Sequence, residues 1–341
     1  MIRWGLIGCG DVTEVKSGPG FQKAHGSSLV AVMRRNGILA ADYAKRHGVP
    51  RWYDDAQALV NDPEVDAVYI ATPPGAHLDG VLLAAAARKP CYVEKPMARH
   101  TTECDAMIAA CAAAKQKLFV AYYRRALPRF LKVKELLDDG ALGQLTGVNY
   151  RLAMSTPANA DPRDGAWRVS AAHGGGGLFL DVGSHLLDFL DFCVGPLTQV
   201  HGRAAHIATT AEVEDVVAMT FLTPTGVPGS ATWNFSSHTK EDTLEFRGTA
   251  GRLSFTFFET DPVRLETADG LEQFDLPTPP HVAQPLIQTV VDDLLARGTC
   301  PSTGESARRT QAIMDRVLTE FYGGREDKFW ERPGTWPGLR R

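Results

Sequence analysis

A segment near the middle of the chain combines glycines with an aspartate and a histidine. Gly174–Gly177 is followed by Asp181, Gly183 and His185, and the four-residue spacing places Asp181 and His185 on one face of a helix. Histidine suits proton transfer at neutral pH, and a carboxylate one turn earlier can hold its tautomer and orientation. Glycine inside a helix costs about 1 kcal/mol relative to alanine, so Gly183 predicts the close approach of another group. The segment leaves open a second interpretation, a capping aspartate beside a buried structural histidine.

A glycine-rich turn follows the first strand-like segment of the chain. In a dinucleotide-binding turn the first glycine permits the bend and the second lets the backbone approach a pyrophosphate. Thr13 stands where a third glycine or alanine is usual, and we expect it to loosen the packing slightly. An ordinary turn is the alternative, although a position at the start of a βαβ unit favours the nucleotide. The predicted contacts are Gly8, Gly10, Asp11 and Val12.

The residues after the second strand-like segment bear on the choice between NAD and NADP. An NAD-binding unit usually has a carboxylate there for the ribose 2′-hydroxyl, whereas this chain has Met33-Arg34-Arg35-Asn36. Two guanidinium groups can hold a 2′-phosphate through charge-assisted hydrogen bonds. The alternative is that Arg34 and Arg35 are solvated loop charges. The sequence favours NADP, with NAD as the alternative.

Two further loops follow strand-like segments. The loop from Ala71 to His77 contains Thr72 and two prolines, which stiffen it, and it is either a ligand loop or a structural turn into the next helix. In Glu94-Lys95-Pro96 the proline holds the lysine extended at the strand end. A lysine fixed beside a nicotinamide would donate a hydrogen bond to a substrate oxygen. By spacing alone, an exposed surface lysine is the competing interpretation.

The elements that would position these residues fall into two regions. Up to residue 121, short apolar strands alternate with helical segments, which predicts a Rossmann-type, doubly wound parallel sheet. From Leu197 to Asp275, strand-like segments follow one another, which predicts a large, mostly antiparallel open sheet in a C-terminal α+β domain. A chain of 341 residues exceeds the usual size of one core. We therefore predict an α/β protein with domains at 1–121 and 122–341.

Composition excludes several classes of function. The net charge of −4 gives no basic excess for nucleic acid, and no apolar stretch reaches the roughly 20 residues that span a bilayer. The six cysteines are scattered without C-x-x-C spacing, so we expect small buried side chains in a reducing compartment and no metal site. The N-terminus has no secretory-signal pattern. Together these features predict a cytoplasmic protein without nucleic-acid or membrane partners.

Taken in order along the chain, these motifs resemble the Gfo/Idh/MocA family of NAD(P)-dependent oxidoreductases. The likeness covers essentially the whole chain. It rests on Gly8-Cys9-Gly10, Ala71-Thr72-Pro73 with His77, Glu94-Lys95-Pro96, Tyr123-Arg124, Trp167-Arg168, and Gly175–Gly177 leading to Asp181, Gly183 and His185.

The resemblance implies a role for each matching residue. Lys95 corresponds to a catalytic lysine, Asp181 to a motif aspartate and His185 to an acid/base histidine, and the Lys95–Pro96 bond is expected to be cis. The resemblance also implies homo-oligomers, dimers or tetramers, formed through the C-terminal sheet. Besides the residues of the glycine-rich turn and the two arginines, the residues expected to bind the cofactor are Thr72, Pro73, His77, Glu94, Lys95, Trp167 and Arg168. The residues expected to bind the substrate are Lys95, Tyr123, Arg124, Asp181 and His185.

We expect hydride transfer between NADP(H), or alternatively NAD(H), and a secondary alcohol or carbonyl of a sugar, sugar derivative or cyclic polyol. Two alternatives stay open: an enzyme that retains its cofactor for a net non-redox step on a glycoside, and a non-catalytic NADP-binding regulator. The polar loop Ser155–Gly177 is expected to shape substrate choice. Glu14–Gly26 departs from the usual short turn, and its role is open between covering the nicotinamide and extending the first helix.

Overall fold

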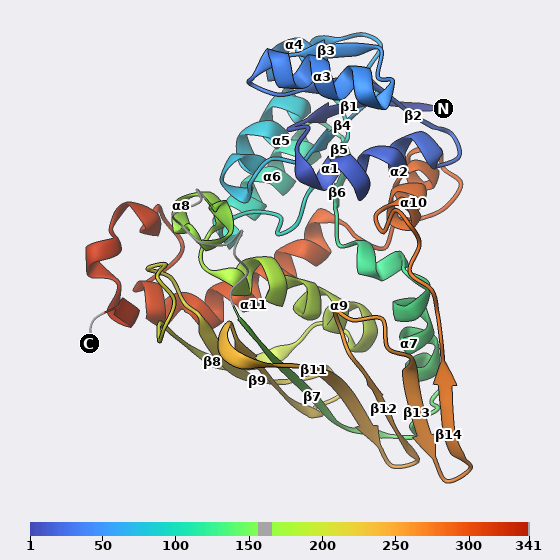
Figure 1. Ribbon diagram of the computed structural model, residues 1–341, viewed down its shortest axis with the longest axis vertical. Helices are drawn as coiled ribbons and strands as arrows, with labels where there is room; N and C mark the ends of the chain where they lie inside the picture. The colour runs from blue at the N-terminus through green and yellow to red at the C-terminus, as the bar shows by residue number, and fades with distance from the viewer. Residues whose placement is uncertain (156–165, 340–341) are drawn as a thin grey trace. The chain divides into compact units, whose positions relative to one another are not determined.

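The computed structural model describes residues 1–155 and 166–339, so residues 156–165 of the expected substrate loop lie outside the described residues. The chain forms two compact units (Figure 1). The first contains Met1–Leu127 and Pro279–Arg308, and the second contains Pro128–Thr278 and Arg309–Arg341. The boundary predicted after residue 121 lies near the first of these divisions. The return of 279–308 to the first unit was not part of the sequence-based prediction.

The first unit contains the predicted parallel sheet. Its six strands are ordered β3-β2-β1-β4-β5-β6, and all neighbouring pairs are parallel. The sequence analysis missed the short strand β3. The strands are β1 (Ile2–Ile7), β2 (Ser27–Met33), β3 (Arg51–Tyr53), β4 (Ala67–Ile70), β5 (Cys91–Val93) and β6 (Leu118–Val120).

The register of this sheet brings the predicted ligand loops to one edge. Ile7 pairs with Met33 and with Ile70, Ile70 pairs with Val93, and Val93 pairs with Val120. These five residues end their strands. The loops that begin at residues 8, 34, 71, 94 and 121 therefore leave the sheet side by side, at the carboxyl edge where open α/β sheets bind ligands.

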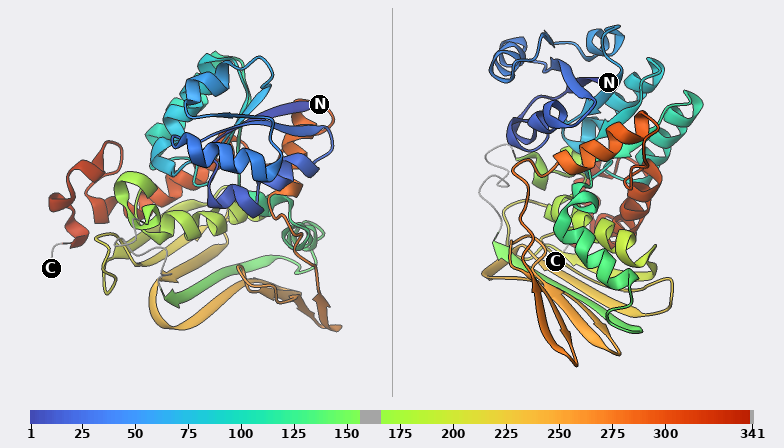
Figure 2. Two further views of the ribbon diagram at one scale, coloured as in Figure 1. Left: turned by 45° about the horizontal axis from the view of Figure 1, so that its top comes forward. Right: turned by 90° about the vertical axis from the view of Figure 1, so that its right-hand side faces the viewer.

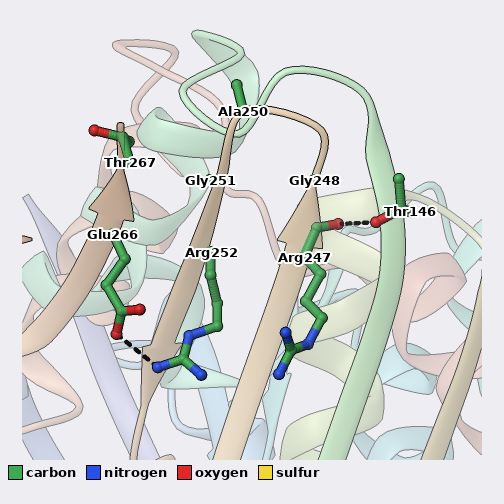
Figure 3. A pocket seen from close by; sticks show the side chains of 8 residues that line it. All are labelled: Thr146, Arg247, Gly248, Ala250, Gly251, Arg252, Glu266 and Thr267. Atoms are coloured by element: carbon green, nitrogen blue, oxygen red, sulfur yellow. Dashed lines mark hydrogen bonds and ion pairs between the residues drawn. The ribbon is translucent and has the colours of Figure 1, made fainter. Parts of the chain in front are cut away.

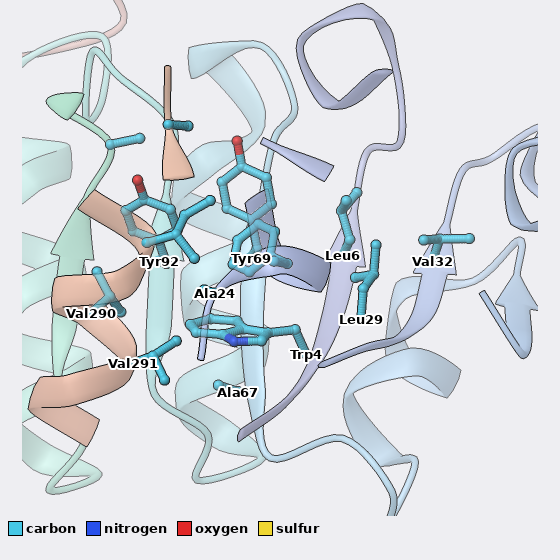
Figure 4. Close-up of a cluster of buried hydrophobic side chains, with 14 of the residues drawn as sticks. Trp4, Leu6, Ala24, Leu29, Val32, Ala67, Tyr69, Tyr92, Val290 and Val291 are labelled. Carbon is cyan, nitrogen blue, oxygen red and sulfur yellow. The ribbon is translucent and has the colours of Figure 1, made fainter. Parts of the chain in front are cut away.

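Helices cover both faces of the first sheet. They are α1 (Asp11–Val15), α2 (Gly18–Lys23), α3 (Gly37–His47), α4 (Ala56–Asn61), α5 (His77–Ala86), α6 (Thr101–Ala113) and α10 (Gln284–Leu294). One face carries a cluster of buried aromatic rings (Figure 4). The ring of Phe21, from α2, lies 4.9 Å from the rings of both Trp4 and Tyr69. Val290 and Val291 of α10 close the same cluster, so the returning segment completes this core.

The second unit contains the predicted open sheet. Its eight strands are ordered β14-β13-β12-β11-β7-β10-β9-β8, and every neighbouring pair is antiparallel except β10 with β7. The strands are β7 (Leu145–Ser155), β8 (Thr198–Ala205), β9 (Val216–Leu222), β10 (Pro228–Asn234), β11 (Ser236–Gly248), β12 (Gly251–Phe255), β13 (Val263–Thr267) and β14 (Gly270–Phe274).

Helices cover one face of this sheet, and along β9 the side chains of the other face are exposed or half-buried. In β9, Val217, Met219 and Phe221 are buried while Thr220 is exposed, which is the alternation expected of such a sheet. Helices α7 (Pro128–Asp138) and α9 (Ser184–Val194) supply aromatic side chains to the covered face, which Figure 2 shows alongside α9. Helix α11 (Gly304–Tyr322) continues from the first unit into the second.

Two expectations drawn from composition can be compared with the structure. All six cysteines are buried, as predicted for small apolar side chains, and they form no disulfide bond among the described residues. Within residues 1–155 and 166–339, every helix is too short or too polar to cross a membrane.

Candidate active site

The glycine-rich turn after β1 has the shape that a dinucleotide requires. Gly8 has φ +92°, and a Cβ on it would lie 2.9 Å from the Thr72 side chain, so only glycine fits. A Cβ on Gly10 would meet nothing closer than the Gly8 carbonyl oxygen at 3.9 Å. The backbone at Gly10 therefore faces open space, where a bulky anionic group can approach it. This arrangement fits a bound pyrophosphate.

Thr13 does not loosen the turn as the sequence suggested. It is fully buried, and its hydroxyl donates a hydrogen bond to the Gly10 carbonyl oxygen at 2.7 Å. Its own carbonyl accepts a hydrogen bond from the Tyr43 hydroxyl at 2.8 Å. Gly18 permits this contact, because a Cβ there would lie 2.2 Å from that carbonyl oxygen. The close packing usually given by the third glycine is supplied five residues later.

The long segment after the turn has a packing role. Phe21 enters the aromatic cluster, and the Ser17 hydroxyl lies 3.1 Å from the Tyr69 hydroxyl. Glu14 accepts hydrogen bonds from Arg46 and contacts the His47 ring, each at 2.7 Å. The Arg46 guanidinium is the main reason that the pKa of Glu14 falls to about 2. Glu14–Gly26 thus fastens the turn to α3 and to the core.

The two arginines after β2 are exposed, and one of them lies over the glycine-rich turn. The Arg34 guanidinium is 3.4 Å from the Cys9 carbonyl oxygen. The following Asn36 caps α3, where its side chain accepts a hydrogen bond from the Leu39 N–H at 3.3 Å. Arg34 and Arg35 thus present positive charge at the sheet edge where the 2′-substituent of a bound ribose would lie.

Asp54 is a residue at this edge that the sequence analysis missed. The Arg34 N–H bonds to the Tyr53 carbonyl at 3.2 Å, which brings the end of β3 beside the end of β2. A Cβ on Gly37 would lie 3.5 Å from the Asp54 carboxylate. Asp54 reaches this edge because β3 pairs with β2, a pairing that the residues after β2 do not reveal.

His77 holds two of the edge loops together. The ring is fully buried, with Nε2 2.7 Å from the Thr72 carbonyl oxygen and Nδ1 3.1 Å from the Met97 carbonyl oxygen. Burial lowers the pKa of His77. The ring therefore ties the loop at Thr72 and Pro73 to the segment just after Lys95. A direct contact from His77 to the cofactor stays a prediction.

Glu94 and Lys95 are held at the end of β5. The buried Tyr69 hydroxyl donates to the Glu94 carboxylate at 2.6 Å, and the Lys95 N–H donates to the same carboxylate at 3.1 Å. Burial raises the pKa of Glu94, which Tyr69 and Lys95 partly oppose. The Lys95–Pro96 peptide bond is cis, as the resemblance implies. Tyr69 is a supporting residue that the sequence analysis did not identify.

The predicted substrate residues after β6 contact each other. They begin the short helix η2 (Tyr123–Ala126). The Arg124 guanidinium lies 5.1 Å from the centre of the Tyr123 ring and donates to its hydroxyl at 3.0 Å. The pair thus places a phenol and a cation at the same edge as the cofactor loops.

Three predicted residues of the second unit come together. Trp167 and Arg168 lie in η5 (Trp167–Val169), with the guanidinium 4.6 Å from the centre of the indole ring. The Arg168 Nε is 3.3 Å from an Asp181 carboxylate oxygen. This ion pair gives Asp181 a cationic partner that the sequence analysis did not assign to it.

His185 lies in the first turn of α9, and its side chain is buried. The predicted helix over Phe179–Phe192 is present, but its first turn, η6 (Phe179–Gly183), is π-helical. Such turns occur frequently at functional sites. A Cβ on Gly183 would lie 2.5 Å from the Phe179 ring, which confirms that another group approaches this glycine.

A surface hollow in the second unit contains none of the predicted residues (Figure 3). Its lining includes Arg247 and Arg252, near one end of β11 to β13. Arg252 forms an ion pair with Glu266, and Arg247 forms one with Glu245, each at 2.6 Å. Since the charges are matched within the protein, we assign the hollow no ligand.

Family comparisons agree with this geometry. Residues 2–122 match a family described as "Oxidoreductase family, NAD-binding Rossmann fold", and residues 130–254 match the "GFO/IDH/MocA C-terminal domain". The chain belongs to the GFO/IDH/MocA oxidoreductase family. Oxidoreductase P35 of Formosa agariphila is 36% identical to this family member over 321 residues, covering 92% of this chain and 97% of the relative.

Solved structures of other proteins share the fold. Levoglucosan dehydrogenase in complex with NADH and levoglucosan superposes with a TM-score of 0.82 at 22% identity, covering 93% of this chain and 96% of that one. A 3-ketoreductase from Actinomadura kijaniata in complex with NADP and TDP-benzene gives 0.81 at 24% identity, covering 93% and 97%. At these identities the likeness concerns the fold alone.

Membership of the GFO/IDH/MocA family makes this protein an oxidoreductase that uses a nicotinamide cofactor. The turn at Gly8 and Gly10 has the open side that the cofactor needs. At the same edge lie a fixed lysine, Lys95, and the Tyr123–Arg124 pair. The second unit, taken by itself, holds a buried histidine, His185, and the Asp181–Arg168 pair. Such groups can stabilise a developing oxyanion and transfer a proton.

Proposed function

We propose that this protein transfers a hydride between NADP(H) and a carbon that carries a secondary alcohol or a carbonyl, in a sugar, sugar derivative or cyclic polyol. The observation that carries the proposal is the placement of Lys95 at the edge where the glycine-rich turn opens. Its backbone N–H donates to the Glu94 carboxylate, and Met97, two residues later, is held by His77. When bound, the nicotinamide supplies or accepts the hydride. Levoglucosan, a sugar derivative, in the complex of one structural neighbour supports this substrate class.

The preference for NADP rests on charge. Arg34 and Arg35 are exposed cations at the end of β2, and a 2′-phosphate accepts charge-assisted hydrogen bonds from guanidinium groups. Asp54 lies beside the same loop and repels a phosphate, so we expect a moderate preference. Both NADH and NADP occur in complexes of structural neighbours, which supports a nicotinamide dinucleotide without deciding between them.

Lys95 and His185 have complementary roles in the proposed reaction. The Lys95 ammonium donates a hydrogen bond to the substrate oxygen and stabilises the charge that develops during carbonyl reduction. His185 gives a proton to that oxygen in reduction and removes it in oxidation. Tyr69 and Glu94 keep the Lys95 backbone in place.

Asp181 orients the proton-transfer group and holds Arg168. The 3.3 Å ion pair holds the guanidinium, whose central carbon lies over the Trp167 ring, 4.6 Å from its centre. Trp167 and Arg168 then offer an aromatic surface and hydrogen-bond donors, a combination that suits a polyhydroxylated ligand. Tyr123 and Arg124 supply a second set of polar contacts to the substrate.

The reaction is tested with Lys95→Ala and His185→Ala, assayed with both cofactors against a panel of sugars and cyclic polyols. We expect each variant to lose about 10²–10⁴-fold in kcat, the usual contribution of general acid–base groups. The affinity for cofactor, measured by titration, should change little for His185→Ala. Near-wild-type turnover in both variants would contradict the scheme.

The same panel separates the alternatives. Cofactor that copurifies and is never consumed while a glycoside is cleaved would indicate a net non-redox enzyme. Tight binding of NADP without turnover on any substrate would indicate a regulator. Light scattering tests the accompanying prediction of a homo-oligomer formed through the C-terminal sheet.

Cofactor choice is tested by thermal unfolding with NADP or NAD. A ligand present at about 100 times its Kd stabilises the folded protein by about 2.7 kcal/mol. At equal concentrations, NADP should therefore raise the Tm more than NAD. A larger shift with NAD would overturn the role given to Arg34 and Arg35.

A further inference from the structure

The glycines before the proposed proton-transfer helix lie directly against Glu214. A Cβ on Gly177 would be 2.2 Å from the Glu214 carbonyl oxygen, and a Cβ on Gly176 would be 3.2 Å from its carboxylate. There is no room for a side chain at either position. Gly177 is two residues before η6, the turn that carries Asp181 and leads into His185.

The Glu214 carboxylate makes two hydrogen bonds inside the second unit. One oxygen accepts from the Gly177 N–H at 2.9 Å, and the other accepts from the Tyr322 hydroxyl. Glu214 is 1% exposed and Tyr322 is fully buried. Burial raises the pKa of Glu214, as expected for a carboxylate withdrawn from water.

Tyr322 is itself fixed by the C-terminal segment. Its ring lies 4.8 Å from Phe329 and 4.7 Å from Trp336, measured between ring centres. The Arg325 guanidinium is 5.0 Å from the Tyr322 ring and donates to Asp315 at 2.9 Å. The phenol therefore has little freedom to leave the carboxylate.

We infer that Glu214 and Tyr322 are positioning residues, which hold the start of the segment that presents Asp181 and His185. The inference rests on the proposed function, since it assigns these residues to the same proton-transfer step. Neither residue touches the substrate in this scheme. They act by fixing the backbone of Gly177.

The chemistry of the pair supports positioning over simple packing. A buried backbone N–H needs a partner, and Glu214 supplies one to Gly177, two residues before η6. A buried carboxylate is costly, and an apolar side chain would fill the same space at lower cost. The carboxylate instead links Gly177 to a phenol more than a hundred residues away in the sequence.

Tyr322→Phe is the decisive variant because it removes one hydroxyl and leaves the aromatic packing in place. Glu214→Gln keeps an acceptor for the Gly177 N–H and is the conservative comparison. Thr310→Val is the matched control: Thr310 is fully buried on the same helix as Tyr322, and its hydroxyl has no partner among the described residues.

Turnover and hydrogen exchange are measured on all three variants in the full-length protein. For Tyr322→Phe we expect kcat to fall about tenfold, with an unchanged Kd for NADP, because small displacements of catalytic groups carry large rate penalties. Glu214→Gln should lose less than Tyr322→Phe. Amide exchange in 177–185 should rise in Tyr322→Phe and stay at the wild-type rate in Thr310→Val.

The two readouts separate the possible failures. If the wild-type protein turns over no substrate, the proposed function fails. Amide exchange in 177–185 then still decides whether Glu214 and Tyr322 hold this segment in place. If Tyr322→Phe and Glu214→Gln both keep wild-type kcat and wild-type exchange, the positioning role is overturned. Equal losses in Thr310→Val and Tyr322→Phe would also overturn it, since they would indicate a general loss of packing.

Discussion

Two glycines in this molecule, Gly10 and Gly177, have opposite structural roles. At Gly10, in the turn after β1, an added Cβ would meet nothing closer than 3.9 Å. At Gly177, before η6, an added Cβ would lie 2.2 Å from the backbone of Glu214. The first glycine leaves a surface open for a ligand, and the second allows one part of the protein to close on another.

The charged residues around Gly10 and around Gly177 differ in a corresponding way. Exposed arginines lie near the first, where charge can meet a dissolved anion. A buried carboxylate lies against the second, where its partners are a backbone N–H and a phenol of the same unit. The comparison teaches that a glycine motif indicates close approach, while its surroundings indicate what approaches.

The comparison predicts that Gly177→Ala has the largest effect on stability. The added methyl group overlaps backbone, so we expect a loss of more than about 3 kcal/mol or a failure to fold. Gly334→Ala is the matched control, because a Cβ at Gly334 meets nothing within 4 Å. Thermal unfolding measures both, and equal Tm values for the two variants would remove the distinction.

For Gly10→Ala we expect the reverse pattern. Gly10 has φ −138°, which alanine adopts without strain, so stability should stay within about 1 kcal/mol of wild type. The methyl group would occupy the space of the pyrophosphate and raise the Kd for NADPH about 30-fold, or about 2 kcal/mol. Fluorescence titration of NADPH gives the Kd. An unchanged Kd would mean that the cofactor does not use this turn.

The charged residues near Gly10 should have a smaller effect, on the Kd for the cofactor. Replacing both Arg34 and Arg35 by alanine should raise the Kd for NADP about tenfold and leave the Kd for NAD unchanged. Asp54→Asn should lower the Kd for NADP by about threefold, since it removes a like charge. Titration of each variant with NAD and with NADP measures both Kd values. Equal changes for the two cofactors would contradict the predicted roles of the arginines and of Asp54.

The smallest expected effect is the pH dependence due to His77. Burial lowers its folded-state pKa below the ordinary value of 6.5, so unfolding takes up a proton below that pH. The stability that the neutral ring contributes is present above pH 6.5 and is lost as pH falls toward the folded-state pKa. His77→Asn should therefore differ less from wild type at pH 5.5 than at pH 7.5, by up to about 1 kcal/mol. Urea unfolding at both pH values tests this, and a constant difference would exclude it.

Much of the architecture could be predicted because its signals are local. Short apolar strands between helices predicted the parallel sheet, and consecutive alternating strands predicted the open one. The strand β3 was missed because Arg51–Tyr53 is only three residues long and half exposed, so it lacks an apolar run. The place of α10 was missed because its attachment to the first unit depends on Val290 and Val291 meeting Trp4 across the chain.

The residues of the candidate site likewise divide into those with local sequence signals and those whose partners are distant in the sequence. Motif residues such as Gly8 and Lys95 occur where local sequence rules predict them, and their chemical roles stay predictions. Asp54, Tyr69 and Glu214 were missed because their importance comes from partners distant in the sequence. Tyr69, for example, reads as an ordinary buried strand residue until its hydroxyl is found 2.6 Å from Glu94.

The return of α10 to the first unit has a consequence for synthesis on the ribosome. Residues 1–127 leave the ribosome long before Ile287, Val290 and Val291, which complete the aromatic core of that unit. At translation rates of 5–20 residues per second, the delay is roughly 10–30 s. During that time the apolar surface around Trp4 and Phe21 lacks its cover. A nascent chain arrested near residue 130 should therefore bind chaperones that recognise exposed apolar surface, and one extended past α10 should release them.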